Sequence, residues 1–410
     1  MKKINKYILA FAATLSLCSC NSWFDGMLDD ELPLNDLVPE NAVVDGRSAE
    51  KALLGVYSYL DDSKYTGGYL GVDLITQSFI RLNLMDANSP STLEREEISK
   101  FIYDENNTSY LSPWSHVYKM INAANNVIYY TEQMDETQCK EELKNSILAE
   151  ARFLRGYCNM YLLQRYAQFY DTSSKYGIIL RLEPSALSNN NRARSTVAES
   201  YEAIYEDLRF AAENAPEFST VYRICKTTAK AFLANYLLVR GTDADRAEAL
   251  KLADEVLESD DFSLEKNYAD IFVKRYNSKE LMFTQFTDEP FGYDANVRGL
   301  AQQLGRGQYK PKETDNSQYF TIIDNDTTER YIATHDTVTF PKSTEPTFVW
   351  KKFCTTEEEA MPMYYMRLAQ LYLIKAEALS YKTGASIGEV LDVINVLRER
   401  ANEPLFEVAD

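Results

Sequence analysis

The chain has 410 residues and a formal net charge of −19. This charge excludes nucleic acid as a partner, because binding to phosphates requires basic patches. Its two histidines leave little room for a histidine-based catalytic triad or metal site. Glycine and proline are scarce, at 15 and 12 residues, which favours long helices over a turn-rich sheet protein.

Residues 1–19 have the pattern of a lipoprotein signal peptide. Three lysines precede an apolar run over residues 7–17, and the segment Leu17-Cys18-Ser19-Cys20 resembles a bacterial lipobox. Cys20 is the predicted lipidation site, because Ser19 before it is small whereas Leu17 before Cys18 is bulky. Acyl chains on Cys20 would anchor the mature chain to a membrane. A transmembrane anchor is disfavoured, because the apolar run is too short to cross about 30 Å of hydrocarbon.

The first half of the mature chain reads as a tether followed by helices. Residues 20–47 are acidic and irregular, which predicts a tether. Apolar residues recur at helical spacing in four further segments, and residues 61–112 between the first two are rich in turn signals. Thr196 and Glu199 form a capping-box pattern at the start of the last segment. The predicted helices are 49–60, 114–133, 141–167 and 196–212.

Two helix pairs are predicted in the second half. Helices 226–240 and 246–257 are joined by a turn at Gly241, and their combined length matches a tetratricopeptide-type repeat. Helices 367–381 and 387–400, with a break at Gly384, form a similar pair. Residues 145–166 resemble the first helix of another, so the sequence predicts at least three pairs.

Between these pairs, residues 262–350 change character. Segments 280–286 and 347–353 alternate between apolar and polar residues as short strands do, and the rest is polar. Such insertions commonly form the binding face of a repeat scaffold. The predicted fold is therefore mostly α, with tetratricopeptide-type helix pairs, a loop-rich insertion at about 262–350 and a few short strands.

Metal and catalytic signals are weak. Besides Cys18 and Cys20 the chain has four cysteines, Cys139, Cys158, Cys225 and Cys354. They lack any CxxC spacing, which argues against zinc, and an extracytoplasmic location would permit disulfides. Cys158 lies within a helical pattern and is expected to be a small buried residue. Segment 324–329 has oxygen ligands for calcium but lacks the EF-hand register, so a polar turn is favoured. No cofactor is predicted, and no pair of carboxylates is selected as catalytic.

Several motifs follow one another in the order found in one family. The chain resembles the SusD/RagB family in these blocks, which divide it into a SusD-like N-terminal region (48–215) and a SusD/RagB-like C-terminal region (216–410). The family usually continues past the last block into another helical stretch, whereas only a few residues follow it here. The matching residues are Ala52, Gly55 and Tyr57; Trp114, Tyr118, Ile121, Asn122 and Asn125; Glu150-Ala151-Arg152-Phe153-Leu154-Arg155 and Tyr157; Tyr201, Ile204, Asp207 and Leu208; Lys226, Ala229, Ala231, Leu233 and Ala234; Arg367, Ile374 and Ala376-Glu377-Ala378; and Asn395, Arg398 and Arg400-Ala401.

The resemblance implies a lipid-anchored protein of the Gram-negative outer membrane that faces outward and binds nutrients. Its partners would be an oligosaccharide and a TonB-dependent SusC-like transporter, on which it acts as a lid without catalysis. Three alternatives remain open: a RagB-like lid that binds peptides, a helical-repeat adaptor for proteins, and a surface glycoside hydrolase. Aromatic residues in loops beside amides favour the glycan-binding reading.

Candidate ligand residues are the loop aromatics and their amide neighbours, because aromatic faces stack on sugar rings and amides bind hydroxyls. The resemblance places ligand contacts just before the Trp114 helix, so that stretch ranks first. Trp114, Trp350, Asn122 and Asn125 are assigned to the scaffold. So are the tyrosines at helical spacing, namely Tyr118, Tyr129, Tyr157, Tyr161, Tyr201, Tyr205 and Tyr236. The candidate ligand residues are Tyr103, Asn106, Asn107, Tyr110, Tyr65, Tyr69, Tyr293 and Tyr309.

Overall fold

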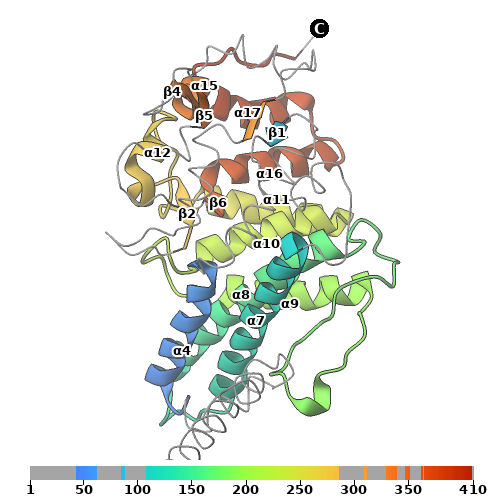
Figure 1. Cartoon of the computed structure of the whole chain (residues 1–410). Helices are drawn as coiled ribbons and strands as arrows, with labels where there is room; N and C mark the ends of the chain where they lie inside the picture. Colours follow the sequence, from blue (N-terminus) through green and yellow to red (C-terminus); the bar gives the residue numbers. More distant parts are fainter. Residues whose placement is uncertain are drawn as a thin grey trace, which may run out of the picture.

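Long helices that pack in chain order form most of the part of the chain that the structure describes (Figure 1). The structure is a computed structural model that describes residues 43–61, 85–87, 108–285, 309–311, 329–338, 347–350, 362 and 364–408. The long helices are α4 (Gly46–Ser58), α7 (Thr108–Glu132), α8 (Glu141–Tyr166), α9 (Val197–Asn214), α10 (Lys226–Arg240), α11 (Asp243–Leu257), α16 (Leu368–Tyr381) and α17 (Ile387–Arg400).

Each long helix from α7 onward packs against the next one in this order, and α4 packs against both α7 and α8. Figure 1 shows α7, α8 and α9 beside one another, with α10, α11, α16 and α17 stacked above them. This arrangement confirms the prediction of a mostly helical fold with tetratricopeptide-like pairs. No helix among the described residues combines the length and apolar character needed to cross a bilayer.

Local sequence signals account for several helix ends. Helix α9 begins with the predicted capping box, in which the Glu199 backbone N–H donates to Thr196 Oγ1 at 3.1 Å and the Thr196 N–H donates to Glu199 Oε2 at 2.7 Å. Helix α10 ends at Gly241, whose φ of 75° is left-handed and suits glycine. Helix α11 starts before the predicted residue 246, because Thr242 accepts the Asp245 N–H and caps it.

Helix α7 corrects one sequence-based prediction. It begins at Thr108, six residues before the predicted start at Trp114, and Pro113 lies inside it. A proline cannot donate the hydrogen bond to the residue four positions back, so one bond near the helix start is lost while the helix continues. Tyr110 therefore lies on a helix and not in a loop.

Within the described residues, the strands form three two-stranded antiparallel sheets. The predicted strands at 280–286 and 347–353 are confirmed in shorter form. Tyr309, expected in a loop, lies in a strand whose pairing with Ala87 no local pattern could reveal. The pairs are β1 (Met85–Ala87) with β3 (Tyr309–Pro311), β2 (Leu281–Phe283) with β6 (Met366–Arg367), and β4 (His335–Val338) with β5 (Thr347–Trp350).

Short helical segments complete the described chain, and α12, beside β2, belongs to the predicted insertion. These segments are η1 (Tyr59–Asp61), η3 (Leu187–Asn189), α12 (Asp270–Lys274), η4 (Arg275–Asn277) and α15 (Glu329–Thr334).

The core is aromatic at its centre. Phe153 of α8 meets Phe232 of α10 and Phe283 of β2 edge to face, with ring centroids 5.0 and 5.8 Å apart. The helical tyrosines are buried or half-buried as predicted, except Tyr129, which is 50% exposed. Cys158 is a free, fully buried thiol, as predicted.

Buried polar groups fix the bundle. Arg155 donates to both carboxylate oxygens of Asp207 at 2.7 Å and to Asn125 Oδ1 at 2.8 Å. The Asn125 amide in turn donates to two backbone carbonyls at 3.0 Å. Asn122 Oδ1 accepts the Ser185 N–H at 2.8 Å. Both asparagines are therefore scaffold residues, as predicted, and the half-buried Trp114 packs against the core.

Candidate functional site

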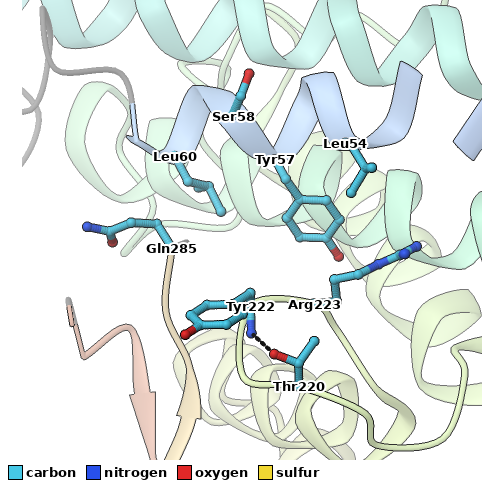
Figure 2. A pocket seen from close by; sticks show the side chains of 8 residues that line it. All are labelled: Leu54, Tyr57, Ser58, Leu60, Thr220, Tyr222, Arg223 and Gln285. Carbon is cyan, nitrogen blue, oxygen red and sulfur yellow. Dashed lines mark hydrogen bonds between the residues drawn. The ribbon is translucent and has the colours of Figure 1, made fainter. Parts of the chain in front are cut away.

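A cavity of about 560 Å³ lies between three segments of the chain. They are the end of α4, the 215–225 loop that joins α9 to α10, and the backbone just after β2. Figure 2 shows α4 on one side, the 215–225 loop on the other, and Gln285 and Arg223 well apart. We call this cavity the α4 pocket. Its described lining residues are Leu54, Tyr57, Ser58, Leu60, Thr220, Tyr222, Arg223 and Gln285.

Helix α4 holds Tyr57 in place. Asp45 caps the helix by accepting the Ser48 N–H at 2.8 Å, and Leu53 and Val56 are buried in the core. The Tyr57 hydroxyl donates to Glu150 Oε2 at 2.7 Å and accepts the Ile224 N–H at 3.1 Å. Burial raises the pKa of Tyr57 well above its ordinary value, so the hydroxyl remains a donor. This residue joins α4, α8 and the 215–225 loop.

Arg223 is bound to two carboxylates. Its Nε and Nη2 atoms donate to the two oxygens of Glu150 at 2.9 and 2.6 Å, and its Nη1 atom donates to Glu50 Oε1 at 3.1 Å. Glu150 is fully buried, and burial raises the pKa of its carboxyl. The guanidinium does not lose its proton in proteins, so its paired bonds favour the ionised form of Glu150. The Glu50 side chain is 42% exposed.

Gln285 is only 1% exposed, yet neither its amide nitrogen nor its amide oxygen has a hydrogen-bond partner within the part of the chain that the structure describes. Its backbone surroundings are fixed, because the Thr284 N–H donates to Val221 O at 3.0 Å and Phe283 O accepts the Tyr365 N–H at 3.2 Å. A buried polar group without a partner costs about 1–3 kcal/mol. Gln285 therefore holds an unused donor and an unused acceptor beside the pocket, and Figure 2 shows its amide turned away from Tyr57 and Arg223.

The other described lining residues carry aromatic, aliphatic and hydroxyl side chains. The Tyr222 backbone N–H points to Thr220 Oγ1 at 3.4 Å, which shapes the loop beneath the pocket (Figure 2). Ser58 turns its hydroxyl to Gly55 O at 2.7 Å. Aromatic rings beside an amide and a guanidinium suit a ligand with apolar faces and many hydroxyl groups.

Comparison with known proteins defines the family. The family model described as "SusD family" matches residues 192–410, and the model described as "Starch-binding associating with outer membrane" matches residues 50–238. This chain belongs to the SusD family. The described lining residues of the α4 pocket therefore come from both matched regions of this SusD-family protein.

Individual relatives have low sequence identity to this chain, but the similarity extends over most of its length. The SusD-like protein P2 of Formosa agariphila is 24% identical over an alignment of 435 residues, which covers 97% of this chain and 82% of the relative. A SusD superfamily protein from Bacteroides vulgatus has a TM-score of 0.72 at 20% identity, over 88% of this chain and 81% of that one. A laminarin-binding SusD-like protein has a TM-score of 0.69 at 20% identity, over 89% and 86%. These structures share the fold of this SusD-family protein.

Most predicted site residues fall outside the described part of the SusD-family chain. Tyr110 lies in α7 and Tyr309 in β3, and neither is among the described lining residues of the α4 pocket. The remaining predicted site residues, outside the described residues, are Cys20, Tyr65, Tyr69, Tyr103, Asn106, Asn107 and Tyr293. Cys354 and residues 324–328 of the polar segment also lie outside them.

Sequence reasoning missed the residues that line the α4 pocket. Tyr57 was counted among the family's scaffold motifs, and Gln285 stood inside a predicted strand. Tyr222 and Arg223 could have been found, because they lie in a short connection between two predicted helices and pair an aromatic ring with a guanidinium. Within the described residues, no cluster of histidine, cysteine, aspartate or glutamate is arranged to hold a metal ion.

Proposed function

We propose that this SusD-family protein binds an oligosaccharide at the outer face of the outer membrane. It passes the oligosaccharide, chemically unaltered, to a TonB-dependent SusC-like transporter. Lipid on Cys20 anchors it to the membrane. Family membership supports this proposal, as does the similarity to a laminarin-binding SusD-like protein.

The chemistry of the α4 pocket is the observation that carries the proposal. Its volume of about 560 Å³ falls within the range of about 300–1,000 Å³ for small-ligand sites. The rings of Tyr57 and Tyr222 can face the apolar side of a sugar. Gln285 supplies a buried amide whose donor and acceptor are both unused among the described residues. A sugar hydroxyl can donate and accept at once, so it suits this amide when the Gln285 side chain turns toward the ligand.

The lining also supports binding without catalysis. None of the described lining residues carries a carboxyl group, whereas most glycoside hydrolases need two carboxyl groups flanking the scissile bond. Glu150, a buried carboxyl group that contacts two of the lining residues, is held by Arg223 and Tyr57. An acid held in this way is not free to protonate a leaving group.

The stretch before Trp114 remains a proposed part of the same binding surface. We propose that Tyr103, Asn106, Asn107 and Tyr110 contact the oligosaccharide, and that the other predicted aromatics, Tyr65, Tyr69, Tyr293 and Tyr309, extend this surface. Tyr110→Ala should then weaken binding. Tyr129→Ala is the matched control, because Tyr129 lies on the same helix α7 and is half exposed.

Calorimetric titration of residues 21–410 with a panel of oligosaccharides tests the proposal. We expect dissociation constants from micromolar to millimolar, which correspond to about 4–8 kcal/mol, because a lid must release its cargo. Chromatography after prolonged incubation should find every oligosaccharide intact. Cleavage products would support the hydrolase instead. Heat from peptides but from no glycan would support the RagB-like alternative, and capture of a protein partner without either would support the adaptor.

A further inference from the structure

The charge around the α4 pocket bears on which sugars the pocket accepts. Arg223 is the only cationic side chain among the described lining residues. Its charge is matched by Glu150, whose side chain is fully buried, and by Glu50. With Glu50 alone ionised this cluster is neutral, and with both carboxylates ionised it is negative. In neither state does the pocket present a net positive charge to a ligand.

We infer that the α4 pocket takes an uncharged stretch of oligosaccharide and discriminates against uronic-acid and sulfated sugars. This inference rests on the proposed function of glycan binding and names the class of glycan. An acidic sugar would have to displace Glu50 from Arg223 or bind beside it without a counter-charge. The net charge of −19 adds a long-range repulsion of the same sign, which salt would screen.

The hydrogen-bonding groups of the pocket point the same way. Arg223 has five N–H donors, and three of them are used by Glu150 and Glu50, so two remain for neutral oxygen acceptors. The Gln285 amide, which turns toward the ligand on binding, needs both a donor and an acceptor. A hydroxyl supplies both, whereas a carboxylate or sulfate only accepts and would leave the amide oxygen of Gln285 facing another acceptor. The pocket is therefore suited to hydroxyl groups more than to anions.

Matched pairs of oligosaccharides test this inference. Residues 21–410 are titrated with neutral hexasaccharides of glucose, galactose and mannose in several linkages, and with uronic-acid and sulfated hexasaccharides of the same linkages. We expect the tightest ligand to be neutral and its dissociation constant to change less than twofold between 20 and 300 mM NaCl, in line with uncharged recognition. A preference for an acidic hexasaccharide, weakened by salt, would overturn the inference and leave the proposed function intact. No binding to any hexasaccharide would overturn both.

A charge variant isolates the cause. Glu50→Gln removes one of the two carboxylates bound to Arg223 without altering the described lining. It should tighten binding of the uronic-acid hexasaccharide about fivefold at 20 mM NaCl, the effect of one unit charge across a water-like gap of about 4 Å. The affinity for the neutral hexasaccharide should change less than twofold.

The matched control is Glu217→Gln, which removes an 87% exposed carboxylate from the 215–225 loop that also carries Arg223. It should alter neither affinity. If Glu50→Gln binds the acidic hexasaccharide with unchanged affinity and has an unchanged melting temperature, the binding of Arg223 by carboxylates does not set the selectivity between neutral and acidic sugars.

Discussion

Replacing Gln285 by leucine should stabilise the protein and weaken ligand binding at the same time. The amide is 1% exposed, and both its polar atoms lack partners within the described chain, so the free protein carries the cost of desolvating them. Leucine has a similar volume and no polar atoms. Removing an unsatisfied buried group of this kind should raise the free energy of unfolding by about 1–2 kcal/mol. For a chain of this length that raises the melting temperature by about 1–2 °C.

Binding should change in the opposite direction. The hydroxyl of the ligand would lose its hydrogen bonds to the amide, at about 1–1.5 kcal/mol, which is roughly a tenfold rise in the dissociation constant. Stability and affinity should thus change in opposite directions. If Gln285 had only a structural role, its replacement would lower both the stability and the affinity.

Thr284→Val provides the matched control for this test. Thr284 is fully buried, its hydroxyl also lacks a partner among the described residues, and it does not line the pocket. Valine at this position should raise the melting temperature without changing affinity. Differential scanning calorimetry and calorimetric titration of both variants decide the matter. A lower melting temperature for Gln285→Leu would refute the reasoning about its amide, and unchanged affinity would remove the α4 pocket from the binding site.

Three other predictions concern the scaffold and the anchor. Ala376→Leu should destabilise by about 1–3 kcal/mol, because Ala376 is buried and its helix α16 packs against both α11 and α17. Glu377→Leu, at an exposed position of the same helix, should leave the melting curve unchanged. Hydrogen bonds from Thr196 lower the pKa of Glu199, so its stabilising effect is present above its unfolded pKa of about 4.3 and is lost as pH falls through the lower folded value. Melting temperatures of Glu199→Gln and the parent should therefore differ more at pH 6 than at pH 3, and a gap that widens on acidification would contradict this. Cys20→Ala should abolish incorporation of a fatty-acid analogue, and undiminished labelling would exclude Cys20 as the lipidated residue.

The sequence alone determined the helical scaffold, because its signals are local. Apolar spacing located the long helices, and Thr196 and Gly241 marked ends that the structure places at the same positions. The order of short motifs across the chain was enough to identify the SusD family, which the matched family models confirm. The start of α7 was missed because Pro113 was interpreted as a helix start, although a helix can continue past a proline at the loss of one bond.

Only the tertiary structure decided where the pocket lies and what charge it presents. Tyr57 and Ile224 are separated by 167 positions yet share a hydrogen bond, and the Tyr57 ring becomes part of a wall only when α4 packs beside the 215–225 loop. The sequence shows that Arg223 is a cation but not that Glu150 and Glu50 occupy it. Nor does it show that the Gln285 amide is buried without a partner. Periodicity reports which face of an element is apolar, whereas a pocket depends on which distant elements meet, and that is set by packing of the whole chain.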